Sequence, residues 1–87
     1  MATTKVKSVT DGDTFTGTGD IVYRLEGVDT PEKGEPKYQE AKDYLTRLID
    51  GKTVSIIERA TDDYGRKIVQ VTFAGESINE KVKNKFG

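Results

Sequence analysis

The stretch Arg24-Leu25-Glu26-Gly27-Val28-Asp29-Thr30-Pro31-Glu32 decides how this chain folds. Apolar and polar residues alternate from position 21 to position 28, which predicts a half-buried strand. Proline fixes its own φ and biases the residue before it toward extended geometry, so we expect the strand to turn at Asp-Thr-Pro-Glu. This turn leaves one arginine on the strand and two carboxylates just beyond its end.

Two other stretches place charged residues in turns. Asp11-Gly12-Asp13-Thr14 lies upstream, and Asp62-Asp63-Tyr64-Gly65-Arg66 lies downstream. Neighbouring aspartate and glycine are typical of turns, because the aspartate side chain bonds to nearby backbone and glycine accepts unusual φ values. We interpret the three stretches as parts of one site that surrounds a metal ion and a phosphate.

The remaining pattern predicts mainly strands. We expect strands over 5–10, 14–16, 21–28, 52–58 and 67–73, with a hairpin turn over 17–20. After the third strand, apolar residues recur at helical spacing from Tyr38 to Ile49. Pro36 suits the first turn of this helix, and Gly51 suits its C-terminal cap. Ser77 or Asn79 is expected to cap a short second helix that runs to Phe86.

Five strands interrupted by one helix after the third strand follow the order of an OB-fold, a small and partly open Greek-key barrel. Several small barrels share this spacing, so the order alone does not separate them. The 87 residues have the length of one domain, and we expect a single OB-fold domain over 1–87.

The composition limits the chemistry. The chain has no cysteine and no histidine, which excludes thiolate nucleophiles, zinc–cysteine sites and imidazole bases. Carboxylate oxygens without imidazole or thiolate suit Ca²⁺ or Mg²⁺. No apolar run is long enough for a membrane span, and the N-terminus lacks the apolar core of a signal peptide. We therefore expect a cytosolic protein, or a secreted or envelope protein whose sequence begins after a removed leader.

The charge is distributed unevenly. The net charge is −1, which does not indicate a nucleic-acid-binding protein by itself. From position 11 to position 35, seven acidic residues face two basic ones, Arg24 and Lys33. Such an excess repels a polyanion unless a cation lies in it, although acidic residues also gather in ordinary solvated turns.

Each candidate residue has a functional and a structural interpretation. One carboxylate of the Asp11–Asp13 turn could ligate a hard cation together with Asp29, and Glu32 could activate water beside it. Arg24 and Arg66 offer planar forks that fit phosphate oxygens. Alternatively, the aspartates only stabilise turns and the arginines are solvated. Because Arg24 shares a strand face with Glu26, opposite Ile21, Tyr23 and Leu25, the two could also form a plain surface pair.

Taken together, the motifs resemble the staphylococcal nuclease (thermonuclease-like) family. The resemblance rests on 11–14, 24–32 and 63–66, on Ile78-Asn79-Glu80, and on the helix from Tyr38 to Gly51, so that it runs from about Val6 to Glu80. It implies an OB-fold and Ca²⁺-dependent hydrolysis of phosphodiesters in DNA and RNA. Residue by residue, it implies calcium carboxylates at Asp13 and Asp29, a carbonyl ligand at Thr30, a general base at Glu32, phosphate-binding arginines at Arg24 and Arg66, a substrate-contacting tyrosine at Tyr64, and a structural or second-layer role for Asp11.

The chain also departs from the family. Its 33–37 loop is short, its net charge is not strongly basic, and the family normally continues beyond Gly87 with the rest of the second helix and a third helix. The resemblance therefore implies a C-terminally truncated OB portion. Three alternatives remain open: a nuclease, a non-catalytic OB module that binds nucleic acid or protein, and a structural subdomain with negligible activity. A homodimer through surface exposed at the shortened C-terminus is a further open prediction.

Overall fold

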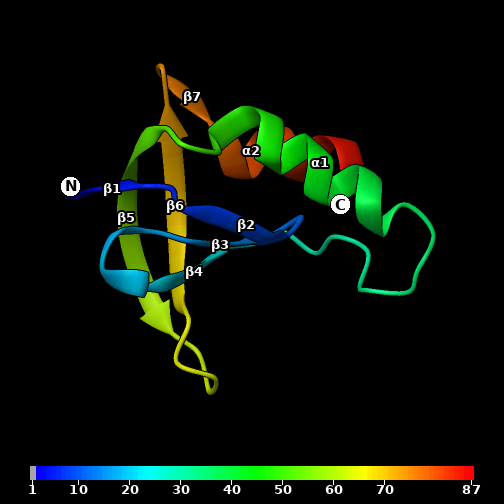
Figure 1. Ribbon diagram of the computed structural model, residues 1–87, viewed down its shortest axis with the longest axis horizontal. Coiled ribbons are helices and arrows are strands. Elements are labelled where there is room, and N and C mark those ends of the chain that lie inside the picture. Colours follow the sequence, from blue (N-terminus) through cyan, green and yellow to red (C-terminus); the bar gives the residue numbers. More distant parts are fainter. Residues whose placement is uncertain (1) are drawn as a thin grey trace.

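The computed structural model describes residues 2–87, in which a strongly curled mixed sheet carries both α-helices on one side (Figure 1). The strands are β1 (Ala2–Lys5), β2 (Ser8–Asp11), β3 (Thr14–Thr16), β4 (Val22–Leu25), β5 (Thr53–Thr61), β6 (Lys67–Phe73) and β7 (Glu76–Ser77). The helices are the 3₁₀ turn η1 (Thr18–Asp20), α1 (Tyr38–Ile49) and α2 (Ile78–Phe86). The fold is thus mainly β, as predicted, and it is consistent with an OB-like fold.

The sheet runs in the order β1-β5-β6-β4-β3-β2, and β7 extends the edge of β6. β4 and β6 are parallel, whereas the other pairings are antiparallel. Because β4 and β6 are parallel neighbours, Arg24 on β4 and Arg66, one residue before β6, approach the same region of the sheet. This topology brings the two arginines together although they lie far apart in the sequence.

The first predicted strand, 5–10, is not continuous: Lys5 is the last residue of β1, and β2 begins only at Ser8. The backbone bends at Val6 and Lys7, where the Val6 N–H donates to the Lys52 carbonyl at 2.9 Å and the Lys7 N–H donates to the Thr16 carbonyl at 2.8 Å. The chain thereby passes from pairing with β5 to pairing with β3. Val6 is buried at this corner, which fixes the bend by apolar packing as well.

The third predicted strand, 21–28, is shorter than expected. β4 ends at Leu25 because Glu26 and Gly27 form a turn, in which Gly27 adopts a φ of 73° that glycine accepts without a steric penalty. The prediction that the strand continues to Val28 was therefore wrong. Ile21, which was predicted on the same face as Tyr23 and Leu25, lies before β4 and is 37% exposed, while the other two are buried.

Other boundaries differ less. The predicted hairpin turn over 17–20 contains η1, and the fourth predicted strand, 52–58, extends as β5 to Thr61 because it pairs with β6 as far as Lys67. α1 begins at Tyr38, so Pro36 lies outside it rather than in its first turn. Gly51 follows the helix with a φ of 73°, as a C-terminal cap requires.

The second helix is capped by Ser77, whose hydroxyl accepts a hydrogen bond from the Glu80 N–H at 3.2 Å. Asn79 is not a cap. It is 4% exposed, and its side chain fills a gap along β6 between the end of the β4 pairing at Val69 and the start of the β7 pairing at Thr72. Its oxygen accepts from the Val71 N–H at 2.8 Å, and its nitrogen donates to the Val69 and Glu26 carbonyls, each at 3.0 Å.

The core lies between the concave face of the sheet and the helices. Its buried apolar members are Val6, Phe15, Tyr23, Leu25, Val28, Leu45, Ile49, Val54, Ile56, Val69, Val71, Ile78 and Val82. In the described part of the chain, neither α-helix is long and apolar enough to cross a bilayer. The homodimer prediction gains no support, since the large apolar residues exposed within 2–87 are Ile21, Ile57 and Tyr64, none of which belongs to α2.

Candidate active site

A cleft of about 430 Å³ opens where the turn between β2 and β3, the loop after β4 and the start of β6 meet. Its lining residues are Asp11, Asp13, Arg24, Asp29, Thr30, Pro31, Glu32, Lys33 and Arg66. Most of the residues predicted for a metal and phosphate site therefore share one cleft. Acidic residues come from the turn and the loop, and the arginines come from β4 and the β5–β6 hairpin.

Asp13 is tied to β4 by both backbone and side chain. Its carbonyl accepts from the Leu25 N–H at 2.9 Å, and its Oδ2 lies 3.4 Å from Nη2 of Arg24. The Thr14 hydroxyl donates to the other carboxylate oxygen, Oδ1, at 2.9 Å. The Asp13 carboxylate is thus oriented by two donors, while each oxygen keeps a lone pair for a further partner.

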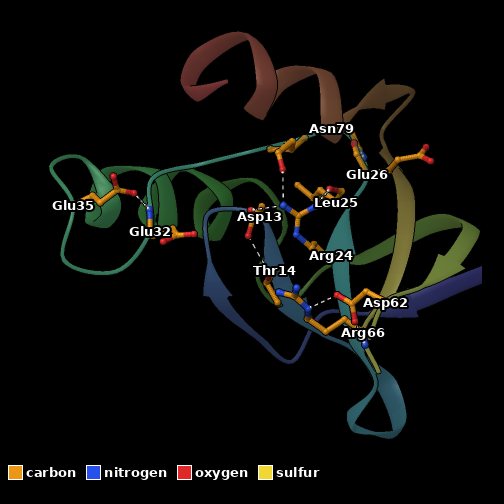
Figure 2. A network of polar contacts seen from close by, with 11 residues as sticks. Asp13, Thr14, Arg24, Leu25, Glu26, Glu32, Glu35, Asp62, Arg66 and Asn79 are labelled. Carbon is orange, nitrogen blue, oxygen red and sulfur yellow. Dashed lines mark hydrogen bonds and ion pairs between the residues drawn. The ribbon is translucent and has the colours of Figure 1, made fainter. Parts of the chain in front are cut away.

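Arg24 is held largely by the protein itself. Its Nη2 also donates to the Val28 carbonyl at 3.1 Å, and its Nη1 lies 3.4 Å from the Leu25 carbonyl (Figure 2). Glu26, which was one predicted surface partner, instead bonds to Gln70 at 2.8 Å and lies 3.5 Å from Arg59. The Arg24–Glu26 surface pair was therefore wrong, because the turn after β4 directs Glu26 away from Arg24.

Gly12 explains why the acidic turn fits against the helix. A Cβ atom at Gly12 would lie 2.7 Å from the Ala41 Cβ and 2.9 Å from the Thr30 Oγ1. Only glycine allows so close an approach. The turn therefore contacts both α1 and the acidic loop, and the position of each depends on the others.

Asp11 faces α1. Its Oδ1 accepts a hydrogen bond from the Tyr38 hydroxyl at 2.6 Å, and the same hydroxyl lies 3.1 Å from the Thr10 carbonyl. The bond to Asp11 favours the protonated phenol and raises the pKa of Tyr38; burial and the negative charges of Asp11 and Asp13 act in the same direction. Asp11 thus lines the cleft while anchoring the start of α1.

The acidic loop after β4 carries Asp29, Thr30 and Glu32. Thr30 is 6% exposed, so it is the buried anchor of the loop, whereas Asp29 and Glu32 are exposed. The Asp29 N–H donates to the Gly87 carbonyl at 2.9 Å, which connects the loop to the end of α2. In Figure 2 the Glu32 side chain points from the loop toward the side of the sheet that carries Asp13.

Arg66 is held by Asp62 at the base of the β5–β6 hairpin. One Asp62 oxygen accepts from the Arg66 Nε at 2.7 Å, and the other accepts from the backbone N–H groups of Tyr64 and Arg66 at 3.0 and 2.9 Å. Burial opposes ionisation of Asp62, but these hydrogen bonds outweigh it and keep the pKa of Asp62 below its usual value. The Nε pairing fixes the guanidinium plane and leaves the terminal nitrogens to extend toward the cleft (Figure 2).

Tyr64 does not line the cleft. It is 86% exposed at the hairpin, where its ring lies 5.4 Å from the Arg66 guanidinium carbon.

Two cleft residues were missed, Pro31 and Lys33, although both belong to the stretch that carries the acids. Asp62 could also have been predicted, because an aspartate four residues before an arginine within one tight turn can bond both the backbone and the arginine side chain.

The donor set of the cleft fits a hard cation. Its side-chain ligands are carboxylate oxygens, and the buried loop at Thr30 can add backbone carbonyl oxygen, which is the oxygen chemistry that Ca²⁺ prefers. Within residues 2–87, no three His, Cys, Asp or Glu side chains stand close enough together to hold an ion by themselves. A cation here would therefore use carbonyl and water oxygens in addition to Asp13 and Asp29.

The sequence pattern of the family described as "Staphylococcal nuclease homologue" matches residues 22–85, which is most of the chain and includes β4, the acidic loop and Arg66.

The chain belongs to this family. It is 32% identical over 62 residues to the staphylococcal-like nuclease CAN1 of Arabidopsis thaliana, covering 71% of this chain and 19% of that protein. It is 33% identical over 78 residues to an uncharacterized endonuclease of Escherichia coli O157:H7, covering 86% of this chain and 50% of that protein. An uncharacterized 38.1 kDa protein of Capnoides sempervirens is 37% identical over 62 residues, covering 71% of this chain and 18% of that protein.

The chain therefore spans about half the length of the bacterial relative and about a fifth of the length of the plant relatives. Membership in the staphylococcal nuclease homologue family agrees with the resemblance that the motifs indicated.

Proposed function

We propose that this chain is one OB-fold domain that hydrolyses phosphodiester bonds of DNA or RNA in the cleft, with Ca²⁺ as cofactor. The observation that carries the proposal is the meeting of Asp13, Asp29 and Glu32 with Arg24 and Arg66 around one 430 Å³ cleft. Carboxylates that suit a hard cation beside guanidinium groups that suit phosphate match the two charges of a metal–phosphodiester pair.

Asp13, Asp29 and the Thr30 carbonyl would hold the cation. When bound, Ca²⁺ supplies positive charge that offsets the acidic side of the cleft and draws a phosphate into it. The Thr14 hydroxyl and Arg24 orient the Asp13 carboxylate, so that this carboxylate is already in position before the cation binds. This orientation reduces the ordering cost of binding.

Glu32 is proposed as the general base. Its carboxylate is exposed on the loop, where it can accept a proton from a water molecule in the cleft. The water oxygen forms the new bond to phosphorus while the ester oxygen leaves. General-base catalysis of this kind contributes about 10²–10⁴-fold to a rate.

Arg66 is proposed to stabilise the charge that grows on the phosphate oxygens. Its guanidinium is fixed through Nε by Asp62, which keeps the fork oriented during the reaction. Arg24 contributes more through Asp13, because its Nη2 already bonds Asp13 and the Val28 carbonyl. A phosphate contact by Arg24 would have to share or replace these bonds.

Cleavage of a fluorescein-labelled single-stranded oligonucleotide by residues 1–87 tests the proposal. We expect turnover with Ca²⁺, none with EGTA, and at least a hundredfold lower kcat in Glu32→Gln and Arg66→Ala. Glu58→Gln, at an exposed position on β5 outside the cleft lining, is the control and should retain wild-type kcat. Unchanged turnover in Glu32→Gln contradicts the proposed role of this residue.

A non-catalytic binding module is the second candidate, and the hairpin favours it. The exposed Tyr64 ring beside the Arg66 guanidinium offers a stacking face next to a cation, as single-strand-binding OB-folds use. Salt-sensitive oligonucleotide binding in EGTA that is weakened by Tyr64→Ala, without cleavage when Ca²⁺ is added, would support this candidate instead.

A further inference from the structure

We propose that Glu35 is a positioning residue that holds Glu32 in its catalytic place by closing the turn between them. The inference rests on the proposed function, in which the Glu32 carboxylate accepts the proton of the attacking water. It adds one residue to the site, and Glu35 does not itself line the cleft.

Two hydrogen bonds join Glu32 and Glu35 in opposite directions. The Glu32 N–H donates to the Glu35 Oε1 at 2.6 Å (Figure 2). The Glu35 N–H donates to the Glu32 carbonyl at 2.9 Å. The first bond is charge-assisted, because its acceptor is a carboxylate, and such bonds are shorter and stronger than neutral ones. Together they close a ring over four residues and fix the backbone from which the Glu32 side chain extends.

The backbone within this ring is shaped for it. Gly34 has a φ of 94°, which is unfavourable for residues with a side chain and which a turn of this kind requires at its third position. Pro31 precedes the ring and fixes its own φ at the entrance. Glu35 therefore completes a turn whose other elements are already imposed by a proline and a glycine.

Packing cannot replace these bonds, because residues 32–37 are all exposed. An exposed segment gains little from apolar burial, so its conformation depends on its hydrogen bonds. The nearest buried anchor is Thr30, two residues before Glu32. Without the Glu35 carboxylate, the Glu32 N–H loses its partner within the turn and the loop gains freedom at the residue that the chemistry needs to be fixed.

The turn also separates two hollows of the surface. Asp29, Thr30, Pro31 and Glu32 line both the cleft and a neighbouring hollow of about 470 Å³, and Glu35 lines only the second. Glu35 thus supports the acidic loop from the side that faces away from the arginines. A loosened turn would let Glu32 move toward the second hollow and away from the water it activates.

Steady-state kinetics on the fluorescein-labelled oligonucleotide with saturating Ca²⁺ test the inference in three variants. Glu35→Ala removes the acceptor, Glu35→Gln keeps a neutral acceptor oxygen of the same reach, and Glu40→Ala removes an exposed carboxylate in the first turn of α1. Two-dimensional amide spectra of the same variants follow the Glu32 N–H directly. Thermal unfolding reports whether the fold is intact.

In Glu35→Ala we expect kcat to fall about tenfold to a hundredfold with KM within about twofold, because a displacement of about 1 Å at a catalytic group costs up to this much. The Glu32 amide signal should move upfield and its hydrogen exchange should accelerate, with little change in Tm. Glu35→Gln should restore most of the lost kcat and the amide signal, and Glu40→Ala should match the wild type in both.

Wild-type kcat in Glu35→Ala, alongside a large loss in Glu32→Gln, would overturn the inference and leave the proposed function standing. An equal loss in Glu35→Gln and Glu35→Ala would also overturn it, since an acceptor oxygen at this position would then not be what holds the turn. If Glu32→Gln turns over like the wild type, or if the wild-type chain cleaves nothing with Ca²⁺, the proposed function fails and the inference fails with it.

Discussion

Replacing Asn79 by alanine removes three hydrogen bonds at the centre of the sheet. The side chain is buried, and it bridges β6 at the gap between its pairings with β4 and β7. Alanine leaves the Val71 N–H and the Glu26 carbonyl without the partner they have in the structure. The Val69 carbonyl keeps a second partner, because the Glu26 N–H also donates to it at 2.9 Å.

The expected loss of stability follows from these two backbone groups, which are left without a hydrogen-bond partner. A buried polar group without a partner costs about 1–3 kcal/mol, so Asn79→Ala should lower the free energy of unfolding by about 2–6 kcal/mol. At about 0.05–0.15 kcal/mol per residue, a chain of 87 residues has a total of roughly 4–13 kcal/mol. The substitution should therefore remove a large share of the stability and lower Tm by at least about 8 °C.

Thermal and urea unfolding followed by circular dichroism measure the loss. Asn84→Ala is the matched control, since Asn84 is exposed on the same helix and should change stability by less than about 0.7 kcal/mol through helix propensity. A Tm of Asn79→Ala within about 3 °C of the wild type would refute the reasoning, because it would mean that the three bonds do not connect β6 to α2 in solution.

Two further predictions concern the acidic turn and the hairpin. Gly12→Ala places a Cβ 2.7 Å from that of Ala41, so α1 must shift. We expect the free energy of unfolding to fall by about 1–3 kcal/mol and kcat to fall as well. Wild-type values for both quantities would contradict the close approach of the turn to α1. The folded-state pKa of Asp62 lies below its unfolded value, so ionised Asp62 stabilises the fold above about pH 4, and this contribution disappears as pH falls through the lowered folded-state pKa. In urea unfolding at several pH values, Asp62→Asn should be less stable than the wild type at pH 6, and the gap should narrow below about pH 4. Asp63→Asn, on the exposed neighbour, should show no such gap, and a gap in Asp62→Asn that does not change with pH would contradict the ion pair with Arg66.

Local patterns predicted those parts of the fold that local physics decides. β6 has the predicted bounds because its apolar residues alternate, and α1 follows the apolar stripe that includes Ala41, Leu45 and Ile49. Ser77 was one of two predicted caps, and it bonds as the first turn of a helix requires. These features depend on residues within a few positions of one another, so the sequence carries their signal.

Other features depend on contacts between distant residues and gave no local signal. The bend between β1 and β2 is set by the Lys52 and Thr16 carbonyls, which belong to other strands. The end of β4 at Leu25 was missed because the alternation of apolar and polar residues continues to Val28, whereas the chain already turns at Gly27. Asn79 looked like a cap because asparagine is a common N-cap residue. Its amide instead bonds to β6 at a gap that exists only in the assembled sheet.

The site residues also fall into those that local sequence patterns predict and those that depend on contacts between distant residues. The carboxylates and arginines were found because they follow strand ends and turns, where parallel and hairpin-linked strands bring residues together. The pairing of Arg24 with Asp13 was missed, because it crosses eleven positions and depends on the register of β3 with β4. The bond from Tyr38 to Asp11 spans 27 positions and has no periodic signal at all.

The most direct test of the proposed cleft is a titration of isotope-labelled residues 1–87 with Ca²⁺, followed by two-dimensional amide spectra. We expect saturable shifts that include the amides of Asp13, Asp29, Thr30 and Glu32, with Arg66 joining them when a nucleoside bisphosphate is added. The same titration of Asp13→Asn should weaken the response. A well-dispersed spectrum that does not respond to Ca²⁺, or that responds only at residues outside the cleft, would contradict the account.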